Sequence, residues 1–95
     1  MAKAQQAMAQ AQNLEVELAN ERFTIDKGPV KAVMAGTGQL VKLSLDKSVV
    51  DPEDIEALED LIVSAVRDGF EKATEVRALR VEAITKNSGL DLPGI

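Results

Sequence analysis

The sequence contains neither cysteine nor histidine. Without cysteine the chain has no disulfide and no thiolate to serve as a nucleophile or a zinc ligand. Without histidine it lacks the commonest general base and the commonest transition-metal ligand. The serines have no histidine partner, and no lysine stands out as a base. We therefore expect no catalytic residues, no metal site, no cofactor and no small-molecule substrate, and we do not expect an enzyme.

Aromatic residues are scarce as well: there are two phenylalanines, Phe23 and Phe70, and no tryptophan or tyrosine. Although 45% of the residues are hydrophobic, many of them are alanines, which bury little area each. A chain of 95 residues makes one domain, here residues 1–95, whose core is marginal in isolation. Association of subunits would strengthen it.

Long apolar runs are missing. No stretch approaches the roughly 18 consecutive apolar residues of a membrane span, and the first residues lack the apolar centre of a signal peptide. We therefore expect no membrane association and a location in the cytoplasm.

The net charge of −5 argues against nucleic acid, because phosphate binding depends on clustered Lys and Arg. The charge is unevenly distributed, however. Residues 52–71 hold one base and seven acids, a net of −6, whereas residues 72–87 hold four bases and two acids, a net of +2. Residues 1–14 hold Lys3 and no acid. The acids are thus concentrated between two basic segments.

The first half of the chain predicts a helix followed by a small sheet. Residues 2–22 are rich in Ala and Gln and lack Pro and Gly, which favours a helix. From Phe23 the polarity alternates with a period of two, and turn residues separate a first strand starting there from strands over residues 30–35 and 39–46. Because the connections are too short for crossovers, we expect a three-stranded antiparallel meander.

The second half predicts one long helix or two shorter ones. Asp51 is suited to cap the helix and Pro52 to occupy its first position, and apolar residues then recur with a helical period to about Lys86. Gly69 leaves open a bend between two helices. Residues 88–95 are expected to form a flexible tail.

The length of this helix predicts a projecting arm. From Pro52 to Lys86 it spans roughly 50 Å, whereas a compact domain of this size is about 30 Å across. In an α+β fold of this order the helix starts at the far edge of the sheet, crosses it, and continues beside the first helix. The two basic segments then meet at the tip of the arm, and a two-fold dimer is the natural way to cover the remaining apolar surface.

Several segments of the chain form an ordered combination that is specific when taken together. They include the paired strands Gly28-Pro29-Val30-Lys31-Ala32-Val33 and Gly36-Thr37-Gly38-Gln39-Leu40-Val41-Lys42-Leu43-Ser44-Leu45-Asp46. They also include the helix start at Asp51-Pro52-Glu53-Asp54, the run Leu58-Glu59-Asp60-Leu61-Ile62 and the ending Ser88-Gly89-Leu90-Asp91-Leu92-Pro93-Gly94. Together these segments resemble the YbaB/EbfC family of bacterial nucleoid-associated proteins. The resemblance implies a tweezer-like homodimer in the cytoplasm that binds double-stranded DNA on the nucleoid. It also implies that the protein alters DNA conformation and contributes to nucleoid organisation and gene regulation.

The candidate DNA-binding residues are the cations near the expected tip: Lys3, Lys72, Arg77, Arg80 and Lys86. At about 100° per residue the neighbouring acids fall on another side of the helix, so these cations are placed to contact phosphates. The competing interpretation is an ordinary solvated helix end, where cations favour the helix dipole. The competing function is a dimeric protein–protein adaptor with no direct DNA contact. The segment Gly36-Thr37-Gly38 joins two strands, so it predicts a hairpin turn and not a phosphate-binding loop.

Overall fold

The computed structural model describes residues 2–87, and the tail expected at residues 88–95 lies outside the described residues. Along the chain the elements are α1 (Ala2–Asn20), β1 (Arg22–Lys27), β2 (Val30–Ala35), β3 (Leu40–Leu45), the short 3-10 helix η1 (Lys47–Val49) and α2 (Ile55–Asn87). The strands form one antiparallel sheet in the order β1-β2-β3. This is the predicted α+β architecture.

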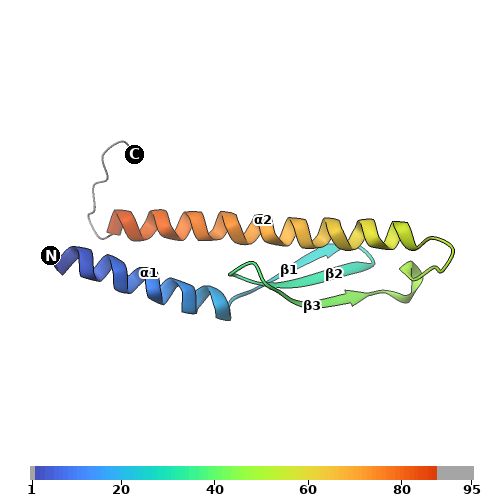
Figure 1. Cartoon of the computed structure of the whole chain (residues 1–95), viewed down its shortest axis with the longest axis horizontal. Coiled ribbons are helices and arrows are strands. Elements are labelled where there is room, and N and C mark those ends of the chain that lie inside the picture. Colours follow the sequence, from blue (N-terminus) through green and yellow to red (C-terminus); the bar gives the residue numbers. More distant parts are fainter. Residues whose placement is uncertain (1, 88–95) are drawn as a thin grey trace.

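The central strand β2 supplies the core of the sheet. Its residues Val30, Ala32 and Met34 are almost wholly buried and face α2, which packs over β1 and β2 (Figure 1). The intervening residues Lys31 and Val33 point to the opposite face, since side chains alternate along a strand. One face of the sheet is therefore covered by α2 and the other is not.

The long helix is continuous, and the two-helix alternative is wrong. α2 runs uninterrupted through Gly69, which lies against Met34 of β2. A Cβ at this position would overlap Met34 Cγ and lie 2.9 Å from Met34 Sδ. The glycine therefore allows close packing on Met34 and does not mark a bend.

The start of the long helix also differs from the prediction. α2 begins at Ile55, three residues after Pro52. Asp51 instead closes a turn, in which Asp51 Oδ1 accepts from Glu53 N and the Asp51 carbonyl accepts from Asp54 N, both at 2.9 Å. The cap is Asp54, whose Oδ1 accepts from Ala57 N at 3.3 Å. Because each of two nearby aspartates can cap, the sequence pattern did not separate them.

The projecting arm is confirmed. The molecule measures 62 × 27 × 14 Å with a radius of gyration of 18.1 Å, against about 12 Å for a compact domain of this length. Beyond the sheet, the C-terminal part of α2 lies beside α1, and the start of α1 and the end of α2 are at the same end of the molecule (Figure 1). We call α1 and residues 72–87 the arm. Leu14 and Leu18 of α1 are buried in it.

Candidate nucleic-acid interface

All five candidate cations belong to the helices of the arm: Lys3, Lys72, Arg77, Arg80 and Lys86. Lys3 lies in α1, and its side chain is outside the part of the chain that the structure describes. The other four lie along the half of α2 that borders α1. Their surroundings differ, and these differences decide what each side chain is free to contact.

Arg77 is joined to Glu15 of α1 by a two-pronged ion pair. Its Nη1 and Nη2 donate to the two carboxylate oxygens of Glu15, the second at 3.2 Å. This hydrogen bonding holds the pKa of the Glu15 carboxyl below its usual range and raises the pKa of Arg77. The arginine side chain is nevertheless 36% exposed and the glutamate 56%. The pair therefore lies at the surface, where solvent and ions reach it.

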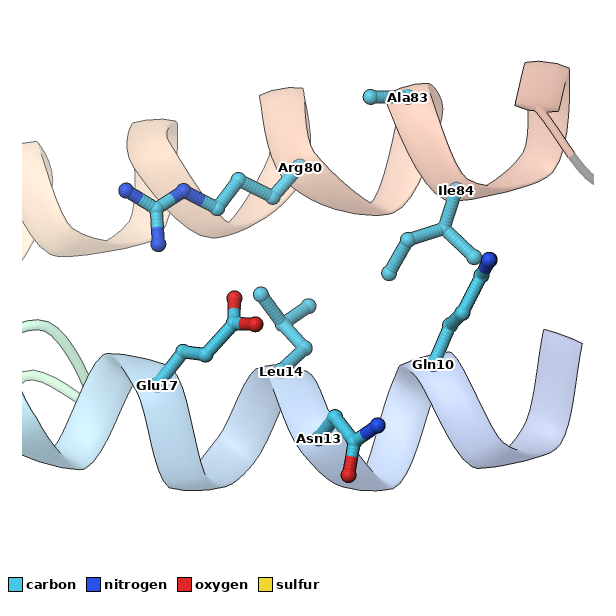
Figure 2. A pocket seen from close by; sticks show the side chains of 7 residues that line it. All are labelled: Gln10, Asn13, Leu14, Glu17, Arg80, Ala83 and Ile84. Carbon is cyan, nitrogen blue, oxygen red and sulfur yellow. The ribbon is translucent and has the colours of Figure 1, made fainter.

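Arg80 makes the second link between the helices, an ion pair with Glu21 at the end of α1. The other carboxylate oxygen of Glu21 is buried without a hydrogen-bond partner. Arg80 also borders an open groove of about 300 Å³ between the two helices. Figure 2 shows its guanidinium across from the carboxylate of Glu17, with Leu14 and Ile84 lining the same groove.

Lys72 and Lys86 have weaker partners. The ammonium of Lys72 lies 5.3 Å from the ring centroid of Phe23, a cation–π distance. Lys86 pairs with Glu82 one helical turn away at 3.0 Å, and the lysine side chain is 73% exposed. Exposed pairs of this kind contribute little stability and are easily exchanged.

Sequence reasoning missed the acids that face the arginines. The count of +2 over residues 72–87 left out Glu15 and Glu21, which lie just beyond the acid-free segment and neutralise Arg77 and Arg80 locally. The available signal was the predicted antiparallel contact of the two helices, which places the acids of residues 15–21 beside α2. Which acid meets which arginine depends on the packing of the helices and not on spacing within either one.

A second surface is apolar and uncovered. Since α2 packs over β1 and β2, large hydrophobic side chains of α2 and of the α2-facing side of β3 remain exposed by 40–57%. We call them the α2–β3 patch: Leu40, Leu45, Ile55 and Phe70. The Phe70 ring lies against the hairpin, because a Cβ at Gly38 would be 3.1 Å from it, so the patch extends from helix to sheet.

Other kinds of site are not formed by the described residues. Within residues 2–87 no three His, Cys, Asp or Glu side chains come together as a metal site. The helices of the same region are too polar or too short to cross a membrane.

Comparison with known proteins gives consistent matches over the whole fold. The model of the YbaB/EbfC DNA-binding family matches residues 1–88. A nucleoid-associated protein of Rhodococcus erythropolis is 39% identical, covering 100% of this chain and 87% of the relative. One from Syntrophobacter fumaroxidans is 40% identical over 96% of this chain and 80% of its own length. The crystal structure of an uncharacterized protein from Helicobacter pylori superposes with a TM-score of 0.73 at 28% identity, covering 82% of this chain and 84% of that one.

Proposed function

Because this chain belongs to the YbaB/EbfC DNA-binding family, we propose that it is a nucleoid-associated protein that binds duplex DNA as a homodimer. It acts on the nucleoid, in the cytoplasm, where it alters DNA conformation and contributes to nucleoid organisation and gene regulation. The observation that carries the proposal is the arm, which projects clear of the sheet with cations along α2. No enzymatic step is needed for this function.

The arm contacts phosphates through side chains that exchange a carboxylate for a phosphate oxygen. Arg77 and Arg80 are more than a third exposed, and an exposed ion pair contributes only about 0–1 kcal/mol. A guanidinium has five N–H donors in a forked arrangement that suits phosphate. In Arg77 two of these donors are hydrogen-bonded to Glu15. Lys72 and Lys86 extend the row toward either end, and Lys3 adds a cation on α1. Such contacts position the protein without reading bases.

The dimer is supported by the α2–β3 patch. Leu40 and Leu45 of the patch belong to β3, which is an edge strand, and Phe70 of α2 lies against the turn that leads into it. A two-fold axis beside β3 buries this patch against its own copy, which extends a core that is small within one protomer. The arms of the two protomers then project on either side of the axis.

The DNA contact is tested by two double variants that break the same ion pairs from opposite sides. Arg77→Gln/Arg80→Gln removes the cations, and Glu15→Gln/Glu21→Gln removes their partners but keeps the cations. We expect the first variant to weaken duplex binding. It should also reduce the magnitude of the slope of log K against log salt by about 2, since each lost phosphate contact reduces that slope by about 1. The second should bind at least as tightly as the parent.

Fluorescence anisotropy with a short labelled duplex over about 50–200 mM salt measures both effects. Lys47→Gln/Arg67→Gln serves as the control for the arginine variant, because it makes the same change in net charge away from the arm. If the two arm variants lose affinity equally, the arginines act by holding the helices together, and the assignment of the site is wrong.

The dimer is tested by light scattering after gel filtration. Phe70→Glu places a charge in the α2–β3 patch, and Leu79→Glu places one at an equally exposed position outside it. We expect the parent and the Leu79 variant at twice the 10.2 kDa protomer mass, and the Phe70 variant at the protomer mass. A parent that stays at 10.2 kDa at all concentrations would contradict the dimer.

The groove on the arm favours one alternative, a protein–protein adaptor. Leu14, Ala83 and Ile84 line it beside Arg80, which suits a short amphipathic segment with an acidic residue. Absence of duplex binding by the parent at the lowest salt would favour this function over the first.

A further inference from the structure

The face of the sheet opposite α2 carries lysines that are not among the proposed DNA contacts of the arm. Lys31 alternates with the buried residues of β2, so it points away from α2. Lys42 of β3 is directly paired with Val33, which shares the face of Lys31. Lys31 and Lys42 are therefore diagonal neighbours on adjacent strands, with Cβ atoms about 7 Å apart. Both are exposed.

These two lysines are free of ion pairs, in contrast to most cations of the arm. Among the residues that the structure describes, the cations in ion pairs are Lys27, Arg77, Arg80 and Lys86. Two acids lie close to Lys31: Asp26 is its cross-strand partner, and Asp46 lines the same hollow. Both carboxylates hydrogen-bond to backbone N–H groups. Asp26 Oδ1 accepts from Gly28 N, and Asp46 Oδ1 accepts from Ser48 N, both at 2.9 Å. Neither carboxylate forms an ion pair with Lys31 or Lys42, so a phosphate that contacts these lysines breaks no ion pair.

The surrounding side chains add hydrogen-bond donors but no means of reading bases. Thr24 lies across from Val33, and Ser44 lies across from Lys31, so both hydroxyls share the exposed face. The two aromatic residues of the chain are elsewhere: Phe23 is paired with Met34 on the α2 side, and Phe70 is in α2. Lysines and hydroxyls without aromatic rings suit a phosphate backbone and not stacked or splayed bases.

We infer that this sheet face is a second phosphate-contact surface for duplex DNA, centred on Lys31 and Lys42. The inference rests on the proposed function, because it takes DNA as the occupant, but it places contacts outside the arm. The face remains open in the proposed dimer, since the α2–β3 patch lies on the other side of the sheet, where Leu45 is paired with the buried Val30.

The test compares Lys31→Gln/Lys42→Gln with the control Lys47→Gln/Arg67→Gln in the full chain. Both double variants remove two exposed cations without an ion-pair partner, so the change in net charge is the same. We expect the sheet variant to lower the slope of log K against log salt by about 2 on a short labelled duplex, with the same loss for duplexes of different sequence. The control should keep the parent slope. Circular dichroism checks that both variants remain folded.

The outcomes separate this inference from the proposed function. If the parent binds DNA and the sheet variant keeps the slope of the control, the second surface is refuted while the DNA-binding function stands. If the parent does not bind at low salt, both fail together. Loss of binding in the arm variant alone also refutes the sheet surface.

A measurement without substitutions gives an independent answer. Acetylation of lysines in the parent, followed by mass spectrometry with and without duplex, reports which ammonium groups DNA covers. We expect protection of Lys31 and Lys42 by at least severalfold and none of Lys47. Equal reactivity of Lys31 and Lys42 with and without DNA overturns the inference.

Discussion

The contact between the end of α1 and the hairpin offers a sharp prediction, because a Cβ added at Gly36 would meet backbone atoms of Leu18 as well as its buried side chain. A Cβ at Gly36 would lie 2.7 Å from the carbonyl oxygen of Leu18 and 3.1 Å from its Cα. Ordinary contact begins at 3.4 Å, so the carbonyl would have to move by about 0.7 Å. Leu18 is fully buried. We therefore expect Gly36→Ala to push the end of α1 away from the hairpin.

The magnitude follows from two opposing effects. Overpacking of this kind costs about 1–3 kcal/mol, and replacing glycine returns about 0.4–1 kcal/mol by restricting the unfolded chain. The net loss is about 1–2 kcal/mol, which lowers the melting temperature of a domain this small by about 5–10 °C. The loss comes from the contact, since Gly36 does not have a positive φ.

Thermal unfolding followed by circular dichroism measures the loss, and amide hydrogen exchange locates it. Exchange should accelerate in α1 more than in β2 or the adjoining part of α2. Gly28→Asn is the control, because a Cβ at Gly28 meets nothing within 4 Å, although its φ is +73°, and asparagine tolerates that region. A Gly36 variant as stable as the parent, with unchanged exchange in α1, would refute the reasoning.

Two further predictions concern the packing of α2 on the sheet and the pH dependence of the arm. Gly69→Ala and Met34→Ala together should lower the free energy of unfolding by less than the sum of their separate effects, because shortening Met34 makes room for the new Cβ. Urea unfolding should give a coupling of about 0.5–3 kcal/mol, and additive effects would contradict the close approach. The pKa of the Glu15 carboxyl is lowered from 4.5 by Arg77, so its contribution to stability is present above 4.5 and is lost as the pH falls through the lowered pKa. Glu15→Gln should remove that part of the acid dependence of α1 exchange, and an unchanged pH profile would contradict the role of the pair.

The fold was largely predictable because its local patterns agree with one another. The alternation around Phe23, the turn at Gly28 and the hairpin at Gly36-Thr37-Gly38 fixed the strands to within a residue or two. The overhang of the last helix followed from its length alone. The predicted first helix ran two residues too far, because Arg22 pairs with Ala35 as part of β1.

The surroundings of the candidate cations were less predictable. Arg77 and Arg80 were expected to lie free for phosphate, and they are paired with Glu15 and Glu21 across the arm. The rotation of one helix against another is set by side-chain packing along both, so neither helix alone contains this information. The exposed lysines of the sheet posed the converse difficulty: alternation along a strand puts Lys42 on the opposite face from Leu43, but only the position of α2 shows which face remains open.

The central claim is that this protein binds the phosphate backbone of duplex DNA through clustered cations despite its net charge of −5. The most direct test is the association constant of the parent protein for AT-rich and GC-rich duplexes as a function of salt. The account predicts binding at low salt, a linear fall of log K with log salt between about 50 and 200 mM, and nearly equal slopes for the two duplexes. Absence of binding at the lowest salt, or binding that does not weaken as salt rises, would contradict it.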